Sequence, residues 1–231
     1  MLTRQEARDF YDDFGRKQGR QSFYEKPALD RLVEIGDFGS AEAVVEFGCG
    51  TGAFAQRLIE EELPMKASYA GFDLSDTMVQ TTRQRLVPCG ARASVTRTDG
   101  RPRIPLPPGS CDRFVSTYVL DLLSSQDIAR TLDQAWKVLR PDGLLCLTSL
   151  TYGTTLSSRI VVAAWLAIHS LRPSLVGGCR PISLGDYLGP ASWKILYSTI
   201  VVARGVPSEV LVARPRAHSK DVRGVNRLID R

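Results

Sequence analysis

Short apolar runs and helical patterns alternate along the middle of the chain. Runs of strand length, such as the one around Val44 and Val45, precede segments whose apolar residues recur every three or four positions. Such alternation is typical of βαβ units, in which helices join parallel strands. The pattern predicts strands at 41–47, 69–74, 93–98, 113–120 and 144–150, and helices at 53–63, from Ser75 to the turn at 88–90, and at 126–139.

The segments before and after this region follow other patterns. Residues 4–38 have helical periodicity with a break at Gly15–Gly19. The segment 153–191 combines a nine-residue apolar run, Ile160–Ile168, with a loop rich in glycine and proline. We therefore expect a short apolar helix in this segment, followed by an irregular loop.

The last part of the folded region predicts a β-hairpin. Residues 192–204 and 209–213 have the composition of strands, and the four-residue link between them is short enough for antiparallel pairing. Taken together, the pattern predicts an α/β fold with a mainly parallel sheet. It divides the chain into a helical cap at 1–40, an α/β domain at 41–213 and a basic tail at 214–231.

A glycine-rich turn directly follows the first predicted strand, in the stretch Glu46-Phe47-Gly48-Cys49-Gly50-Thr51-Gly52. Glycines let a ligand approach the backbone, and the N-terminus of the next helix offers free N–H groups. The dinucleotide fingerprint G-x-G-x-x-G would place its third glycine one position later. The stretch therefore predicts a binding turn of a different kind.

Acidic residues end the next two predicted strands. Asp73 lies 21 residues after Gly52, where a carboxylate can accept hydrogen bonds from both hydroxyls of a ribose. Asp99, in the stretch Thr98-Asp99-Gly100, ends the third strand, and a short polar group there can contact the amino group of an adenine. Because parallel strands end at one edge of the sheet, these features predict a single nucleoside-binding site.

Together these motifs resemble the class I S-adenosylmethionine-dependent methyltransferases. The stretch 46–52 is similar to the family motif E/D-x-G-x-G-x-G, Asp73 to its ribose-binding acid, and Thr98-Asp99-Gly100 to its adenine-contacting segment. Arg140-Pro141-Asp142-Gly143-Leu144 resembles the L-[KR]-P-G-G turn before the fifth strand, with Asp142 in place of a glycine. The resemblance covers residues 40–213. It implies a Rossmann-like, mostly parallel sheet of seven strands in the order 3-2-1-4-5-7-6, with helices on both faces and the hairpin at its end.

Within this class the chain is most similar to the small-molecule branch that includes the ubiquinone/menaquinone C-methyltransferases. Tyr11-Asp12 resembles a pair that helps to close over the cofactor in that branch, and Ser116-Thr117-Tyr118 resembles the segment that faces its methionine part. The resemblance implies S-adenosyl-L-methionine as the cofactor, with 153–191 as a lid that contacts an apolar or aromatic small-molecule acceptor. The implied cofactor-binding residues are Tyr11, Glu46, Gly48, Cys49, Gly50, Gly52, Asp73, Leu74, Met78, Asp99, Gly100, Thr117 and Tyr118.

The catalytic residues are less clearly marked. A general base is needed only where the attacking group must lose a proton. The candidates are Tyr118 near the expected reaction centre, and His169, Tyr152 and Arg180 in the segment expected to cover it. His169 fits equally well as a partner of the helix dipole. The apolar helix itself fits either a lid or core element or a peripheral contact with a membrane surface.

Two other function classes remain as alternatives. The first is a non-catalytic protein that binds S-adenosylmethionine as a sensor or partner subunit. The second is a nicotinamide-dependent oxidoreductase, which the glycine spacing disfavours. A nucleic-acid amino-methyltransferase would carry D/N-P-P-aromatic after the fourth strand, where this chain has Ser116-Thr117-Tyr118-Val119.

Composition narrows the class further. The chain has 231 residues, of which 43% are apolar and 24% charged, as in soluble globular proteins. Its net charge is +5, and residues 214–231 carry +4 of this, so the body lacks a basic surface for nucleic acid. The five cysteines form no Cys-x-x-Cys pair, so no metal site is expected. The longest apolar run has nine residues and the first residues alternate in charge, so we expect a cytoplasmic protein. A monomer or a homodimer is expected.

Overall fold

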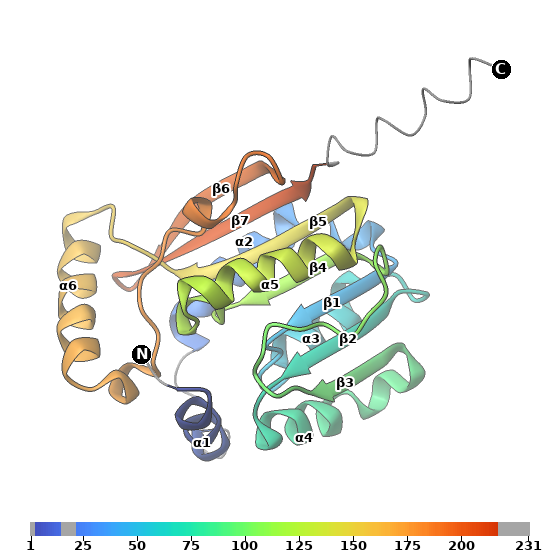
Figure 1. Ribbon diagram of the computed structural model, residues 1–231, viewed down its shortest axis with the longest axis horizontal. Coiled ribbons are helices and arrows are strands. Elements are labelled where there is room, and N and C mark those ends of the chain that lie inside the picture. Colours follow the sequence, from blue (N-terminus) through green and yellow to red (C-terminus); the bar gives the residue numbers. More distant parts are fainter. Residues whose placement is uncertain (1–2, 15–21, 217–231) are drawn as a thin grey trace.

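Seven strands form one sheet in the order β3-β2-β1-β4-β5-β7-β6 (Figure 1). The computed structural model describes residues 3–14 and 22–216, so most of the basic tail lies outside the described residues. β1 to β5 pair in parallel, whereas β7 runs antiparallel to both β5 and β6. This order confirms the expected topology. The strands are β1 Ala43–Phe47, β2 Ser68–Asp73, β3 Ala93–Arg97, β4 Cys111–Thr117, β5 Leu139–Leu150, β6 Trp193–Ala203 and β7 Val206–Pro215.

Helices connect the strands and cover the sheet. Three of them begin with the side-chain caps that favour helix initiation. The side chain of Ser75 accepts from the N–H of Met78, that of Ser124 from the N–H of Asp127, and that of Thr155 from the N–H of Ser158. The main helices are α1 Arg4–Phe14, α2 Ser22–Ile35, α3 Ala53–Arg57, α4 Asp76–Arg85, α5 Ser125–Val138 and α6 Leu156–Leu171. The shorter ones are η1 Phe38–Ser40, η2 Leu58–Glu62, η3 Val87–Arg92, η4 Leu120–Leu122, η5 Pro173–Val176 and η6 Leu184–Tyr187.

Alternating side chains of the buried strands build two apolar cores. Val44 faces the core in which α2, α3 and α4 pack on the sheet, whereas its neighbour Val45 faces the core that α5 covers. Ile182 and Trp193, from the segments around η6 and β6, add to the second core. Because both faces of the central strands are buried, β1 and the second half of β5 are mainly apolar runs, as the sequence pattern indicates. β4 differs, since it also buries Asp112 and Arg113.

Three predicted strand limits were wrong, each for a local reason. β4 ends at Thr117 rather than at residue 120, because Tyr118 has a φ of 56° and turns the chain away from the sheet. The hairpin turn is Arg204-Gly205, both with positive φ, as in the tightest β-turns, so β7 already begins at Val206. β5 includes Leu139, which pairs with Cys111 before the proline-glycine turn interrupts the ladder.

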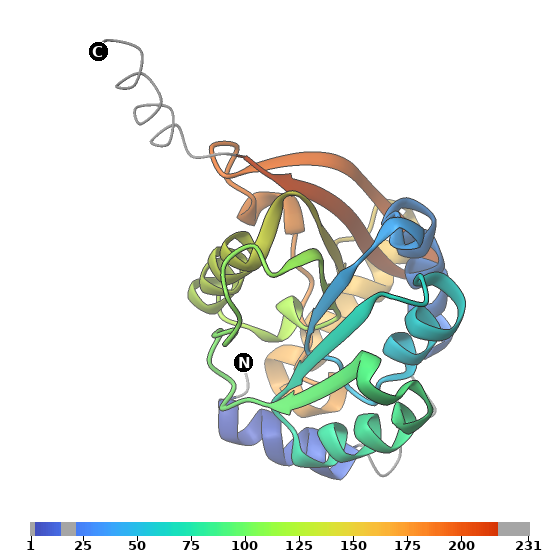
Figure 2. The same cartoon turned by 90° about the vertical axis from the view of Figure 1, so that its right-hand side faces the viewer.

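Two helices lie outside the sheet layers. α1 crosses the carboxyl ends of β1 and β2 and packs beside α4 (Figures 1 and 2). α6 stands at the far edge of the molecule, where it contacts β7 and η5 (Figure 1). Over residues 3–14 and 22–216, no helix has the length and apolar character needed to cross a membrane.

Candidate functional site

A cavity of about 540 Å³ opens at the carboxyl ends of the central strands. This volume lies within the range of small-molecule sites in proteins. Its wall combines the glycine turn, the ends of β2 and β4, and residues of α1 and α2. The lining residues are Thr3, Arg4, Ala7, Tyr11, Tyr24, Glu25, Leu29, Glu46, Phe47, Gly48, Cys49, Gly50, Thr51, Ala53, Phe54, Phe72, Asp73, Leu74, Met78, Thr98, Gly100, Thr117, Tyr118, Val119, Leu122, Leu123, Ser124, Asp127 and Cys179.

The glycine turn exposes backbone to this cavity. Gly50 has a φ of 53°, and a Cβ added there would meet no atom within 4 Å. Gly48 has a φ of 80° and leaves no room for a side chain, because its Cβ would lie 2.2 Å from Val119. Gly52 lies outside the cavity wall formed by the described residues, and its Cβ would collide with Thr82 of α4. Gly52 therefore serves close helix packing, whereas Gly50 leaves space for a ligand.

Asp73 joins β2 to the glycine turn. Its carboxylate accepts hydrogen bonds from the backbone N–H groups of Gly50 at 2.8 Å and of Ser75 at 2.9 Å. Burial raises the pKa of Asp73 to about 6, and the same N–H bonds oppose that rise. Each carboxylate oxygen has a second lone pair, so both can still accept from the hydroxyls of a bound ribose.

The wall beside Asp73 is mainly apolar. Leu74 and Met78 line it together with Thr98 and Gly100, which suits the flat face of a nucleobase. Asp99 lies outside the part of this wall that the described residues form. Its side chain is 67% exposed, and its carboxylate accepts from the N–H of Arg101 at 2.9 Å. The structure therefore brings the neighbours of Asp99 to the cavity, but not its carboxylate.

Glu46 and Cys49 lie deep beneath the glycine turn. Glu46 is 1% exposed, and its carboxylate accepts a hydrogen bond from the hydroxyl of Tyr69 at 2.5 Å. Burial raises the pKa of Glu46 to about 7 and also raises the pKa of the Cys49 thiol. The thiol is therefore a protonated packing group rather than a nucleophile.

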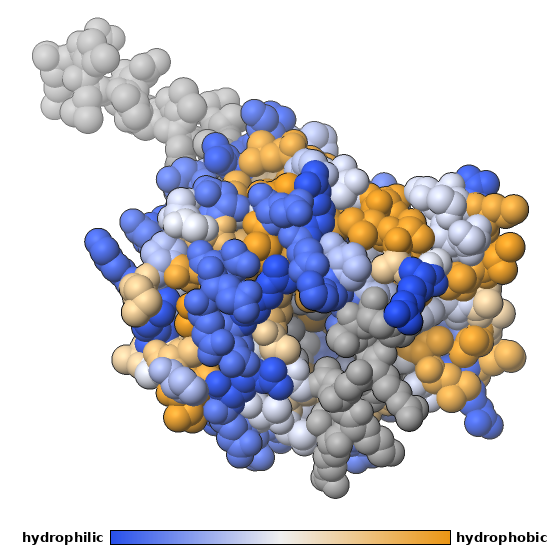
Figure 3. All heavy atoms as spheres, turned by 180° about the vertical axis from the view of Figure 1, so that it is seen from behind, coloured by the Kyte–Doolittle hydropathy of each residue, from blue (hydrophilic) through white to orange (hydrophobic). Residues whose placement is uncertain are grey.

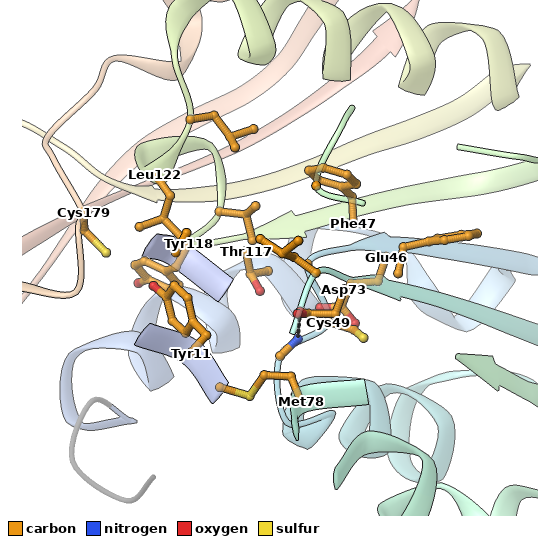
Figure 4. A pocket seen from close by; sticks show the side chains of 18 of the residues that line it. Tyr11, Glu46, Phe47, Cys49, Asp73, Met78, Thr117, Tyr118, Leu122 and Cys179 are labelled. Atoms are coloured by element: carbon orange, nitrogen blue, oxygen red, sulfur yellow. Dashed lines mark hydrogen bonds between the residues drawn. The ribbon is translucent and has the colours of Figure 1, made fainter. Parts of the chain in front are cut away.

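The other end of the cavity is aromatic. Figure 4 shows Tyr11, Tyr118, Leu122 and Cys179 gathered there, away from Asp73. The hydroxyl of Tyr118 donates to Ser208 Oγ at 2.8 Å, and that of Tyr11 donates to the backbone oxygen of Gly177 at 3.2 Å. The end of β4, helix α1 and the segment after α6 thus meet around one apolar space.

Helix α2 contributes three lining residues that the sequence analysis missed, Tyr24, Glu25 and Leu29. Tyr24 is 4% exposed and packs edge-on against the ring of Tyr118, with 5.7 Å between ring centroids. Its neighbour Glu25 also lines the cavity. No motif surrounds either residue, and only the packing of α2 against β5, β6 and β7 brings them here.

Three of the candidate catalytic residues lie elsewhere. His169, Tyr152 and Arg180 are absent from the cavity wall as far as the described residues form it. Tyr152 is 51% exposed, and Arg180 donates to the backbone oxygen of Leu123 at 2.8 Å. Tyr118 is the one candidate that the fold places at the cavity.

Helix α1 lies across the opening of the cavity, where polar contacts with α5 and α4 hold it. Arg4 forms an ion pair with Asp127 of α5 at 3.0 Å. Asp12 accepts hydrogen bonds from Ser75 Oγ and from the N–H of Thr77 at the start of α4. These contacts place Tyr11 over the cavity, and the covering role expected of the Tyr11-Asp12 pair stays a prediction.

No group of histidine, cysteine, aspartate and glutamate residues in the described part of the chain is arranged to hold a metal ion. The set that lines the cavity fits S-adenosylmethionine instead. The open space at Gly50 admits the ligand, and the oxygens of Asp73 retain acceptor capacity. The apolar wall at Leu74 and Met78 suits the adenine.

Comparison with known proteins agrees with this geometry. Residues 44–143 match the family model described as a methyltransferase domain. A malonyl-[acyl-carrier protein] O-methyltransferase of Yersinia pestis is 29% identical over 126 residues, which cover 54% of this chain and 42% of that protein. The chain spans about half the length, or less, of the curated relatives it matches.

Solved structures share the fold. The [4+2]-cyclase SpnF superposes with a TM-score of 0.71 at 16% identity, covering 92% of this chain and 97% of that one. Magnesium protoporphyrin IX methyltransferase (ChlM) from Synechocystis PCC 6803, solved with bound SAH, superposes with a TM-score of 0.60 at 18% identity. The match covers 94% of this chain and 89% of that one. The comparisons thus show a methyltransferase domain at residues 44–143, and a fold over most of the chain that these solved structures share.

Proposed function

We propose that this protein transfers a methyl group from S-adenosylmethionine to a small, apolar or aromatic acceptor by in-line displacement. One observation carries the proposal: a single cavity joins the glycine turn and Asp73 to an aromatic end formed by Tyr11, Tyr24 and Tyr118. A cofactor held at the first end would present its methyl group towards the second.

The residues of the chain would act mainly by positioning. S-adenosylmethionine supplies a methyl group on a sulfonium, which is already a strong electrophile. Asp73 and the glycine turn would hold the nucleoside, and Thr117 and Tyr118 would border the methionine part. Tyr11 and Leu122 would exclude water from the acceptor. Such orientation of two reactants lowers the barrier by removing much of the entropy cost of their encounter.

Thermal unfolding with ligands tests the cofactor part of the proposal. Ligand at 100 times its dissociation constant stabilises the native state by about 2.7 kcal/mol. For a chain of this size the midpoint should rise by about 5 to 10 °C. We expect this rise with S-adenosylmethionine and S-adenosylhomocysteine, but not with NAD. We also expect Asp73→Ala and Asp73→Asn to lose the rise.

Asp76, three residues after Asp73, provides a matched control. Asp76 begins α4 with a half-exposed carboxylate that pairs with Arg97 at 2.9 Å, outside the cavity wall of the described residues. Asp76→Asn should keep the full ligand shift. A shift with NAD alone, or no shift with either adenosyl ligand, would contradict the proposal. Adenosyl-ligand binding without methyl transfer to any of a panel of quinols, phenols and lipids would favour the non-catalytic alternative.

The outer face of α6 supports a further proposal, contact with an anionic lipid surface. Leu156, Ile160 and Leu171 are 78%, 62% and 83% exposed, and apolar side chains gather on this side of the molecule (Figure 3). No acidic residue occurs between Asp142 and Asp186, whereas Arg159 and Arg172 flank the apolar face. Exposed apolar side chains bordered by cations are typical of helices that lie in a membrane interface.

α6 is also connected to the cavity. The indole N–H of Trp165 donates to the backbone oxygen of Cys179 at 2.9 Å, and Cys179 lines the aromatic end. Only the segment that contains Cys179 would therefore separate a lipid surface in contact with α6 from the proposed acceptor space. An apolar acceptor dissolved in that surface would have a short route to the site.

A further inference from the structure

Glu25 is a carboxylate at the aromatic end of the cavity, and the fold holds it there firmly. It lies in the first turn of α2, next to Tyr24. The ring of Tyr24 packs edge-on against Tyr118 on one side and against Trp165 on the other, at centroid distances of 5.7 and 6.5 Å. This packing fixes the start of α2 against the end of β4.

Glu25 differs from every other acid that lines the cavity. Asp73 is held by two backbone N–H groups, Glu46 by the hydroxyl of Tyr69, and Asp127 by Arg4. Within residues 3–14 and 22–216, no hydrogen bond or ion pair engages the Glu25 carboxylate. A partly buried carboxylate without a partner is costly, and a ligand that donates a hydrogen bond would relieve that cost.

The groups around Glu25 do not supply a compensating charge. It acts electrostatically on Tyr24 of its own helix, on Tyr118 after β4, on Asp121 of η4 and on Cys179 after η5, and none of these is a cation. Burial raises the pKa of Glu25 to about 7. The carboxyl group is therefore poised near neutral pH, as a general base requires.

The charge balance of the cavity also limits its acceptor. Arg4 is the one cation in the wall that the described residues form, and it is already paired with Asp127. An acceptor carboxylate or phosphate at the aromatic end would face Glu25 without a free cation. A neutral acceptor with an O–H group would face a ready hydrogen-bond acceptor.

We propose that Glu25 binds the hydroxyl of a neutral, apolar or aromatic acceptor and takes its proton during methyl transfer. In this step the O–H bond breaks and its proton passes to the Glu25 carboxylate. The oxygen lone pair forms the new bond to the methyl carbon, and the carbon–sulfur bond breaks with its electron pair remaining on sulfur. The sulfonium becomes a neutral thioether. This inference rests on the proposed function and adds its acceptor class and base.

Two probe molecules of the same shape test the inference without turnover. 4-tert-Butylphenol stays neutral between pH 6 and 9, whereas 4-tert-butylbenzoate is an anion throughout. Their dissociation constants are measured by calorimetry on protein saturated with S-adenosylhomocysteine. We expect the wild type to bind the phenol at least as well at pH 8 as at pH 6. Its affinity for the benzoate should fall by about fivefold between pH 7 and 8, because benzoate binding requires protonated Glu25.

Three variants make the result specific. Glu25→Gln should bind the benzoate more tightly than the wild type at pH 8 and lose the pH dependence, whereas Glu25→Asp should keep it. Glu34→Gln, on the same helix but 60% exposed and paired with Arg31, should behave as the wild type. Asp121 also has a pKa raised to about 7, but it lies outside the cavity wall that the described residues form. It is present in the wild type and in all three variants, so it cannot cause a difference between them.

Each outcome decides between the two proposals. A pH dependence that is the same in Glu25→Gln, or failure of both probes to bind while S-adenosylhomocysteine binds normally, overturns the role of Glu25 and leaves the proposed function intact. Failure of S-adenosylhomocysteine to bind overturns the proposed function itself.

Discussion

The carboxylate of Asp73, at the end of β2, accepts a hydrogen bond from the backbone N–H of Gly50, in the turn after β1. This 2.8 Å bond holds together the two halves of the proposed nucleoside site before any ligand arrives. A site arranged in advance loses less conformational entropy on binding. The bond also places the open space at Gly50 next to a carboxylate that can still accept further hydrogen bonds.

We predict that Gly50→Ala weakens cofactor binding more than it weakens the fold. The alanine methyl group would project into the cavity, and a φ of 53° adds about 1 kcal/mol of strain. Affinity for S-adenosylhomocysteine should fall at least tenfold by calorimetry, with a midpoint of unfolding lower by a few degrees. Gly109→Ala is the control, because Gly109 has a φ of 66° and open space but lies outside the described cavity wall. Equal affinity losses in both variants would contradict the prediction.

Tyr118→Phe should reduce stability while preserving the cavity. The Tyr118 hydroxyl donates to the fully buried Ser208, and loss of such a bond costs about 1 kcal/mol. The midpoint should fall by about 2 to 4 °C in calorimetric scans. Because the ring remains against Tyr24, binding of S-adenosylhomocysteine should stay within about twofold of the wild type. A large loss of binding in this variant would assign the hydroxyl a direct role at the ligand.

Asp121 should make stability decrease as the pH rises. It is 0% exposed, its Oδ2 accepts from the N–H of Leu150 at 3.1 Å, and its Oδ1 has no partner among the described residues. Burial raises its pKa from 3.8 to about 7. The folded state then holds a proton that the unfolded state has lost, so stability is fully present below about pH 4 and is lost as the pH rises to 7.

Asp121→Asn removes this titrating group. The shift of about three pKa units corresponds to at most about 4 kcal/mol. Between pH 5 and 8, the free energy of unfolding from urea titrations should therefore fall less in Asp121→Asn than in the wild type, while the exposed Asp133→Asn follows the wild type. Identical pH profiles for all three proteins would show that Asp121 is ionised in the folded state.

The lipid-contact proposal predicts binding to anionic vesicles. The wild type should sediment with vesicles of phosphatidylserine and phosphatidylcholine, and less with phosphatidylcholine alone. Leu171→Glu should reduce binding at least fivefold. Met65→Glu should not, although Met65 is as exposed as Leu171, at 81% and 83%. Concentration-dependent dimerisation that Leu171→Glu abolishes, with no vesicle binding, would assign the α6 face to a second copy of the chain instead.

The cofactor end of the site follows from local patterns in the sequence. Each of its features, the glycine turn, Asp73 and the Thr98–Gly100 segment, directly follows a strand in the chain. Parallel strands bring such positions to one edge of a sheet without any further information. The sheet order followed from the resemblance of these motifs to a known family. Where a predicted side chain lies outside the described cavity wall, as for Asp99, its neighbours Thr98 and Gly100 still line it, and only the local turn directs the carboxylate elsewhere.

By itself, then, the sequence determined the fold and the edge of the sheet at which the cofactor site is proposed, because both depend on short-range periodicity and on glycine geometry. Only the tertiary structure decided the acceptor end. Tyr24 and Glu25 come from a helix that precedes the sheet, and Cys179 from the segment between β5 and β6. They meet Tyr118 because α2 packs against β5 to β7 and Trp165 holds the Cys179 segment. Contacts so distant in the chain leave no periodic pattern, so His169 and Arg180 drew attention in the sequence while Glu25 did not.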